Sequence, residues 1–139
     1  DDEQTAQYFS DVLMLEPDNP IALAGMSALG VDEHRESQLK RLLTEQKNSA
    51  SLHFSLGNYY AAQARWSEAQ LAYFNAYQLA PDQALLALNL AISLEHLGLK
   101  QLAAQYYRRA VQADTSKRAD FNHATIEQHA QQLIAKNVQ

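Results

Sequence analysis

Apolar and small side chains recur with a helical spacing in the middle of the chain, and this pattern repeats after 34 residues. Between residues 50 and 83 these positions fall three or four residues apart in two runs, which Ala64 and Arg65 separate. Residues 84–117 repeat the arrangement. Apolar or small side chains occupy corresponding positions of the two segments in six pairs. The pairs are Leu56 and Leu90, Gly57 and Ala91, Tyr60 and Leu94, Ala69 and Ala103, Tyr73 and Tyr107, and Ala76 and Ala110. The spacing predicts amphipathic helices, and the fixed period predicts stacked helix-turn-helix units.

Turn residues indicate where these helices begin and end. Proline cannot continue the hydrogen-bond ladder of a helix, so Pro81 ends a helix that starts near Trp66. Gly98 is expected to adopt the left-handed conformation that closes many helices. The sequence therefore predicts further helices over about 83–97 and about 100–113.

The flanking segments continue the pattern less completely. Residues 1–19 are interpreted as the second helix of a truncated unit, and residues 20–49 as a shortened unit with helices near 20–30 and 33–46. Residues 118–139 carry one apolar stripe on a polar helix, as expected for the cap of a stacked array. We therefore expect one all-α domain over residues 1–139, with about eight antiparallel helices, that is a fragment of a longer protein.

The composition excludes several classes of function. The chain has no cysteine, which excludes disulfides and thiolate-bound metals but leaves the compartment open. The net charge of −5 argues against nucleic-acid binding. No apolar run reaches the ~18 residues of a membrane-spanning helix. We expect no nucleic-acid partner and no insertion of these residues into a membrane.

No catalytic or metal-binding pattern is present in the sequence. The five histidines show neither a spacing of four residues nor a His-Glu-x-x-His motif. The four glycines are isolated and do not form a phosphate-binding loop, and no nucleophile motif occurs. The sequence therefore predicts a protein that is not an enzyme and has no catalytic residues, cofactor or metal site.

The repeated residues resemble the tetratricopeptide repeat (TPR) family. The resemblance is carried by LGNYY at residues 56–60, followed by Trp66, Ala69, Tyr73, Ala76 and Pro81. It implies an α-solenoid of antiparallel helix pairs wound into a right-handed superhelix, in which the first helix of each unit lines a concave groove.

A narrower resemblance concerns a particular group of bacterial repeat proteins. Segments such as ESQLKRLLTEQ at residues 36–46 and the run over residues 52–82 are similar to TPR proteins of type IV pilus biogenesis, notably of the mannose-sensitive haemagglutinin pilus. This similarity implies the periplasmic part of a membrane-anchored protein. An unrelated bacterial TPR scaffold and a cytoplasmic location remain alternatives.

The TPR resemblance also implies which residues face the groove. The candidate partner-binding residues are Phe54, Asn58, Leu85, Leu88, Asn89, Ile92, Glu95 and His96. The apolar members would form an exposed patch, which usually marks a binding site, unless the terminal helix or a further segment covers it.

Asn58 and Asn89 are the polar candidates in the groove, because an amide can both donate to and accept from the backbone of an extended peptide. Local hydrogen bonds at the helix surface are the alternative. The two residues match the asparagines of TPR proteins that bind a C-terminal carboxylate. Phe54, Ala119 and His123 stand where the basic residues of that site would be, so carboxylate binding is not expected.

Two functional hypotheses follow. In the first, the chain is a non-catalytic module that binds a protein or peptide partner in its groove and acts as a scaffold in pilus or secretion assembly. In the second, it is a structural spacer or a self-assembling unit that associates through an exposed terminal repeat face.

Overall fold

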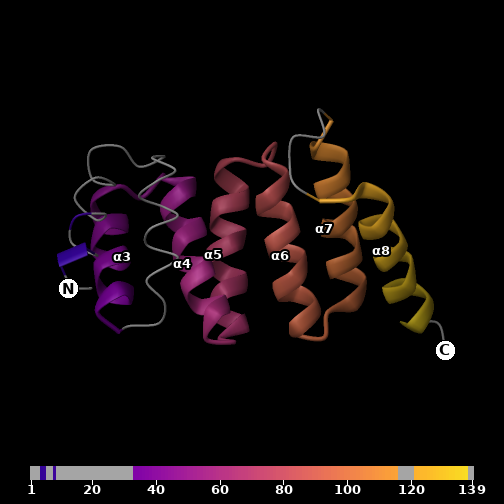
Figure 1. Ribbon diagram of the computed structural model, residues 1–139, viewed down its shortest axis with the longest axis horizontal. Helices are drawn as coiled ribbons and strands as arrows, with labels where there is room; N and C mark the ends of the chain where they lie inside the picture. Colours follow the sequence, from indigo (N-terminus) through magenta and orange to yellow (C-terminus); the bar gives the residue numbers. More distant parts are fainter. Residues whose placement is uncertain (1–3, 6–7, 9–32, 116–120, 138–139) are drawn as a thin grey trace.

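The structure, a computed structural model, describes residues 4–5, 8, 33–115 and 121–137. From residue 33 onward, the regular elements of the described residues are six α-helices (Figure 1). They are α3 (Glu33–Glu45), α4 (Ala50–Ala62), α5 (Trp66–Leu79), α6 (Ala84–His96), α7 (Lys100–Ala113) and α8 (His123–Asn137). The predicted all-α fold is confirmed for this part of the chain.

The helix bounds agree closely with those expected from the sequence. The helix predicted over 83–97 is α6, the one predicted over 100–113 is α7, and the one predicted over 33–46 is α3. Residues 4, 5 and 8 are helical, but otherwise the predictions for residues 1–30 lie outside the described residues, as do those for 118–120.

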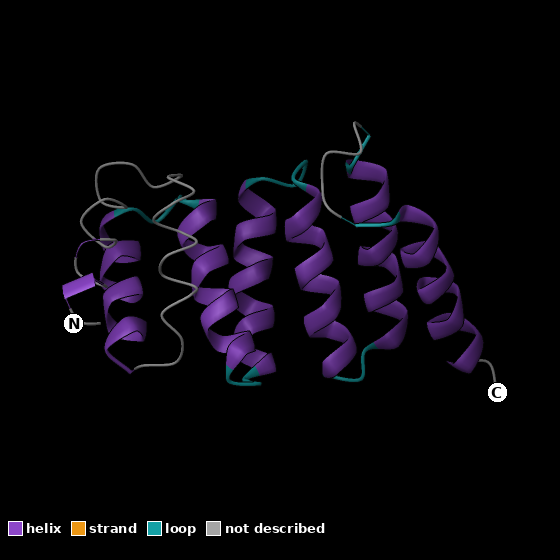
Figure 2. Ribbon diagram, viewed as in Figure 1, coloured by secondary structure: helices purple, strands orange, loops and turns teal. Residues whose placement is uncertain are grey.

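The six helices follow one another in a row and run alternately in opposite directions (Figure 1). Each packs against its neighbours in the chain, most closely α4 against α5 and α6 against α7. The described turns lie alternately at the upper and lower edges of the row (Figure 2). None of the helices among the described residues is long and apolar enough to cross a membrane.

The turns after α4 and α6 share one backbone geometry. Ala64 and Gly98 both adopt a left-handed conformation, with φ of 57° and 81°, which confirms the expectation for Gly98. The residue after each of them closes the turn with a backbone N–H. These bonds, each 3.0 Å long, run from Arg65 N to Tyr60 O and from Leu99 N to Leu94 O. Left-handed backbone costs an alanine roughly 1–2 kcal/mol, so the packing of the two adjoining helices must offset that cost at Ala64.

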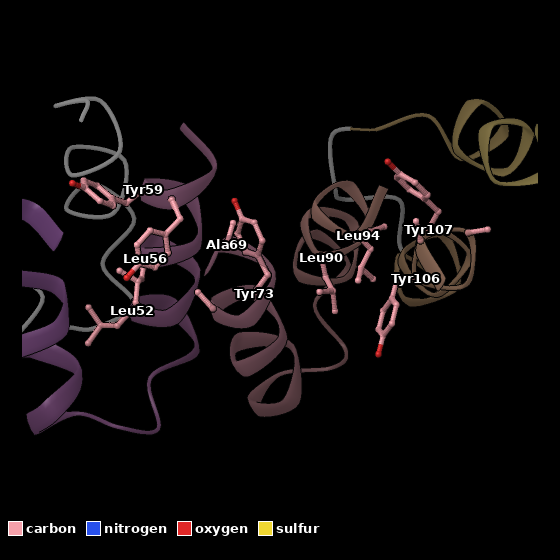
Figure 3. Packing of buried hydrophobic residues seen from close by; sticks show 14 of the residues in the cluster. Leu52, Leu56, Tyr59, Ala69, Tyr73, Leu90, Leu94, Tyr106 and Tyr107 are labelled. Atoms are coloured by element: carbon pink, nitrogen blue, oxygen red, sulfur yellow. The ribbon is translucent and has the colours of Figure 1, made fainter. Parts of the chain in front are cut away.

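The repeated sequence positions form the core. Every residue in the six repeated pairs is buried, and one cluster of buried residues extends from Leu39 on α3 to Leu133 on α8. Figure 3 shows labelled members of this cluster, including Leu56, Tyr73 and Leu90. Burial of this apolar surface stabilises the row, because each helix has apolar neighbours on the adjacent helices.

Gly57 lets α4 and α5 approach closely. A Cβ atom at this position would lie 2.5 Å from Cδ1 and Cε1 of the Tyr73 ring. Carbon atoms in contact normally stay about 3.5–4.0 Å apart. Position 57 therefore has room only for glycine while the buried Tyr73 ring keeps its present position.

Arg65, in the turn between α4 and α5, connects α3 to α5. Its Nη1 lies 2.7 Å from Glu36 Oε1 on α3, and its Nη2 lies 2.6 Å from Glu68 Oε2 on α5. The guanidinium also stacks over the Tyr60 ring, with 4.6 Å between Cζ and the ring centroid. These contacts fix α3 against the turn between α4 and α5. The hydrogen bond from Arg65 is also the main reason why the pKa of Glu36 is lowered.

The last helix has one apolar side. Ala130 and Leu133 of α8 are buried, and Ile126 and Ile134 pack partly buried against the core. The opposite side is polar and exposed, at positions Gln128, Gln131 and Gln132. The described side chains of α8 thus place their apolar side on the core and their polar side in solvent.

Candidate partner-binding surface

Phe54 and Asn58 lie one turn apart on α4, and both contact Tyr73 of α5. The ring centroids of Phe54 and Tyr73 are 5.8 Å apart, and the Tyr73 hydroxyl donates to Asn58 Oδ1 over 2.6 Å. Both α4 residues are half-buried. The structure thus brings together two of the candidate residues. The amide oxygen of Asn58, however, already accepts the hydrogen bond of the buried Tyr73 hydroxyl.

The candidates on α6 lie along one side of that helix, because they are spaced three or four residues apart. Leu85 is 46% exposed, whereas Leu88 and Ile92 are partly buried against the core. Asn89 Nδ2 donates to the carbonyl oxygen of Leu85 over 2.8 Å. Leu85 is therefore the most accessible apolar side chain of the candidate set, and Asn89 makes the local helix bond that the sequence left open as an alternative.

Glu95 joins three helices. Its Oε1 accepts a hydrogen bond from the Tyr107 hydroxyl of α7 over 2.8 Å and lies 2.7 Å from Nε2 of His129 on α8. Burial alone would raise the pKa of Glu95, but the bonds to His129 and Tyr107 outweigh it, so the pKa is lowered. The carboxylate of this candidate residue is engaged by the terminal helix.

His96 ends α6 and stacks on Trp66, the first residue of α5. Their ring centroids are 3.8 Å apart and the planes differ by 2°. His96 is exposed and Trp66 is half-buried, so the histidine covers one face of the indole. This contact joins the turn before α5 to the turn after α6, which lie at the same edge of the row (Figure 2), and it was not foreseen from the sequence.

The buried tyrosines at the repeated position have a polar role that the pattern of apolar positions does not reveal. Tyr73 donates to Asn58 and Tyr107 donates to Glu95, so each hydroxyl reaches the preceding helix of its own pair. A buried tyrosine hydroxyl usually has a hydrogen-bond partner. The presence of tyrosine rather than phenylalanine at both positions was the available signal.

Burial raises the pKa of Tyr73, and from this we predict a loss of stability at alkaline pH. The unfolded chain releases the phenolic proton near pH 10, whereas the folded chain retains it to higher pH. Rising pH therefore favours the unfolded chain, and the contribution is fully present only below about pH 10.

Urea denaturation at pH 8 and pH 11 measures this effect. Tyr73→Phe should reduce the alkaline loss by about 1 kcal/mol, since one pH unit corresponds to about 1.4 kcal/mol for one group. Tyr8→Phe, at an exposed position, should keep the wild-type loss. Equal losses in wild type and Tyr73→Phe would contradict the prediction.

The surface of the described residues offers neither a metal cluster nor a deep pocket at these positions. No group of three or more histidine, aspartate or glutamate side chains is close enough to hold a metal ion in the described ranges. An open hollow of about 540 Å³ lies elsewhere, between the turn before α4 and the turn before α6, and is lined by residues that include Lys47, Ser49, Leu79 and Gln83. Leu85 and His96 are the exposed members of the candidate set, and the other six are half-buried.

A scan against models of known protein families finds no match to this chain, and a search of curated proteins finds no similar sequence.

Proposed function

We propose that this chain is a non-catalytic, TPR-like interaction module that binds a protein or peptide partner on the face formed by α4 and α6. In this proposal the helix pairs α4–α5 and α6–α7 are consecutive repeats of a right-handed solenoid, and the first helix of each pair lines its concave side. The 34-residue period, which recurs in the backbone bonds of the turns after α4 and α6, supports it.

The observation that carries the proposal is the apolar character of the candidate face. Leu85 is nearly half exposed. The other apolar candidates, Leu88, Ile92 and Phe54, are only partly buried. Exposed apolar groups on a soluble domain usually serve an interface when they gather on one face. We infer that apolar side chains of the partner supply most of the binding energy.

The charges on this face narrow the kind of partner. The candidate set contains no lysine or arginine, and its single carboxylate, on Glu95, is held by Tyr107 and His129. A partner segment without a cluster of charges therefore fits the surface best, because charged groups would lose hydration without gaining an opposite charge.

The cellular role is a narrower proposal and depends on the resemblance to pilus-associated TPR proteins. On that basis the chain serves as a scaffold in pilus or secretion assembly and works in the periplasm as part of a membrane-anchored protein. A bacterial TPR scaffold in the cytoplasm is the alternative.

Affinity capture with matched variants tests the proposed surface. Leu85→Glu with Asn89→Ala places a charge on the candidate face at an exposed position, so the fold should tolerate it. Leu71→Glu is the matched control, since Leu71 is 58% exposed on α5. Partners identified with the wild-type chain should be lost, with at least tenfold weaker binding, only in the α6 variant.

The same experiment can contradict the assignment. If both variants retain the partners equally, α4 and α6 do not form the binding face. If Leu71→Glu alone loses them, the partner binds the other side of the row.

A second proposal is that the chain is a self-assembling spacer. Exposed leucines outside the candidate face favour it, namely Leu71 and Leu79 on α5, Leu99 beside α7 and Leu102 on α7. Light scattering over a range of concentrations distinguishes the two proposals, because a mass that stays monomeric at all concentrations is incompatible with self-assembly.

A further inference from the structure

The helix α8 is held to the row by four apolar side chains and by several polar contacts. Ala130 and Leu133 are buried among its described side chains, and Ile126 and Ile134 pack partly buried against the core. Elements with few buried apolar contacts open at a lower free energy than the rest of a domain. The polar contacts of α8 therefore have a large share in deciding how often this helix leaves its position.

Three polar contacts connect α8 to other described residues. His129 Nε2 lies 2.7 Å from Glu95 Oε1 of α6, and Arg108 Nε of α7 lies 2.9 Å from Glu127 Oε1. His123 Nε2, at the start of α8, lies 2.8 Å from Oδ2 of Asp114, the residue that ends α7. Two of these contacts pair a histidine with a carboxylate.

His129 lies among groups from all three helices. Glu95 and the neighbouring His96 belong to α6, and Tyr107 of α7 packs its ring edge-on against the imidazole, with 5.2 Å between centroids. The Tyr107 hydroxyl donates to the same Glu95 oxygen that His129 contacts. On α8 itself, Glu127 is already paired with Arg108. The carboxylate of Glu95 is therefore the acceptor for two neighbouring helices at once.

The His129–Glu95 contact changes its strength with protonation. The side chains are 39% and 32% exposed, so protons have access to both. A neutral imidazole makes an ordinary hydrogen bond to the carboxylate, whereas an imidazolium makes a charge-assisted bond, which is roughly twice as strong. Histidine changes charge between about pH 5 and 8. Once Glu95 itself is protonated, the ionic attraction is lost.

We propose that α8 is a pH-sensitive latch that docks most firmly where Glu95 is ionised and His129 is protonated, and that loosens toward both alkaline and strongly acidic pH. Protonation of the imidazole favours the docked helix because the opposing carboxylate is close only in that state. Protonation of Glu95 favours release for the same reason. Burial raises the pKa of Glu95, but the hydrogen bonds to His129 and Tyr107 outweigh it, so the docked helix favours the ionised carboxylate. The latch does not depend on the identity of a partner.

Hydrogen exchange of the α8 amides tests the latch in the intact chain. Opening constants for residues 123–137, corrected for intrinsic exchange, are measured at pH 4, 5.5 and 8, with residues 66–79 of α5 as the internal reference. We expect α8 to open roughly three- to fivefold less often at pH 5.5 than at pH 8, the size appropriate to a half-exposed ion pair, and to open more often again at pH 4.

Matched variants assign the effect to the proposed residues. His129→Gln and Glu95→Gln should each remove the difference between pH 5.5 and pH 8. Arg108→Gln breaks the Arg108–Glu127 pair of the same interface, and it should increase opening at both pH values without changing their ratio. Because this control weakens docking as well, it separates pH response from a merely looser helix.

Two results would overturn the proposal. One is a wild-type chain whose α8 opens equally at pH 5.5 and pH 8. The other is a pH response that survives in His129→Gln but disappears in His123→Asn, which would place the response at Asp114.

Discussion

Replacing Leu90 with alanine is expected to lower the free energy of unfolding by about 2–5 kcal/mol, as large-to-small changes in a packed core do. Leu90 has no exposed surface and belongs to α6, which packs against both α5 and α7. The change removes apolar contact area and leaves a cavity that neighbouring helices close only in part. Because α6 packs against both neighbouring helices, the damage should weaken the contacts on both of its sides.

Urea denaturation followed by circular dichroism measures this loss. Leu85→Ala is the matched control, because it truncates the same side chain on the same helix at a position that is 46% exposed. It should cost about 0.5 kcal/mol or less, as surface substitutions usually do. Equal losses for the two variants would show that Leu90 does not lie in the core.

Replacing Gly57 with alanine is expected to destabilise the chain by about 1–3 kcal/mol, the usual cost of overpacking. Helix propensity alone predicts the opposite sign, since alanine is favoured over glycine within a helix by about 1 kcal/mol. The new methyl group would stand 2.5 Å from two carbons of the Tyr73 ring. That ring is buried and tied to Asn58 by its hydroxyl, so it has little freedom to move aside.

A double-mutant cycle checks whether the ring is the cause. Tyr73→Leu removes the clashing atoms, so Gly57→Ala should cost much less, or even stabilise, in that background. Ala62→Gly, at an exposed position near the end of the same helix, calibrates the propensity difference between the two residues. A Gly57→Ala chain that is more stable than wild type would contradict the close approach of α4 and α5.

The candidate surface and the latch are connected through Glu95. The TPR resemblance implies a groove position for this residue, and its carboxylate bonds to α7 and α8. Docking of α8 therefore restricts access to the candidate surface near the end of α6. A partner that needs the Glu95 carboxylate would have to compete with His129, whereas one that binds at Leu85 would not.

The sequence by itself determined the all-α class, the approximate bounds of helices α3 to α7 and the repeated positions that form the core. Leu56, Tyr73 and Ala110 were recognisable as buried because the helical period places them on the apolar side of their own helices. Gly98 was recognisable as a turn residue because a left-handed backbone favours glycine over other residues. These properties are local, and the chain encodes them within a few residues.

Only the tertiary structure decided which polar groups meet. The bond from Tyr73 to Asn58, the stack of Trp66 on His96 and the position of His129 over Glu95 all join different helices. Such contacts depend on the distance and rotation between helices, which the volumes of all the packed side chains determine together. The period of the sequence indicates on which face of its own helix a residue lies. It does not specify where the neighbouring helices are placed, and the polar partner comes from one of those helices.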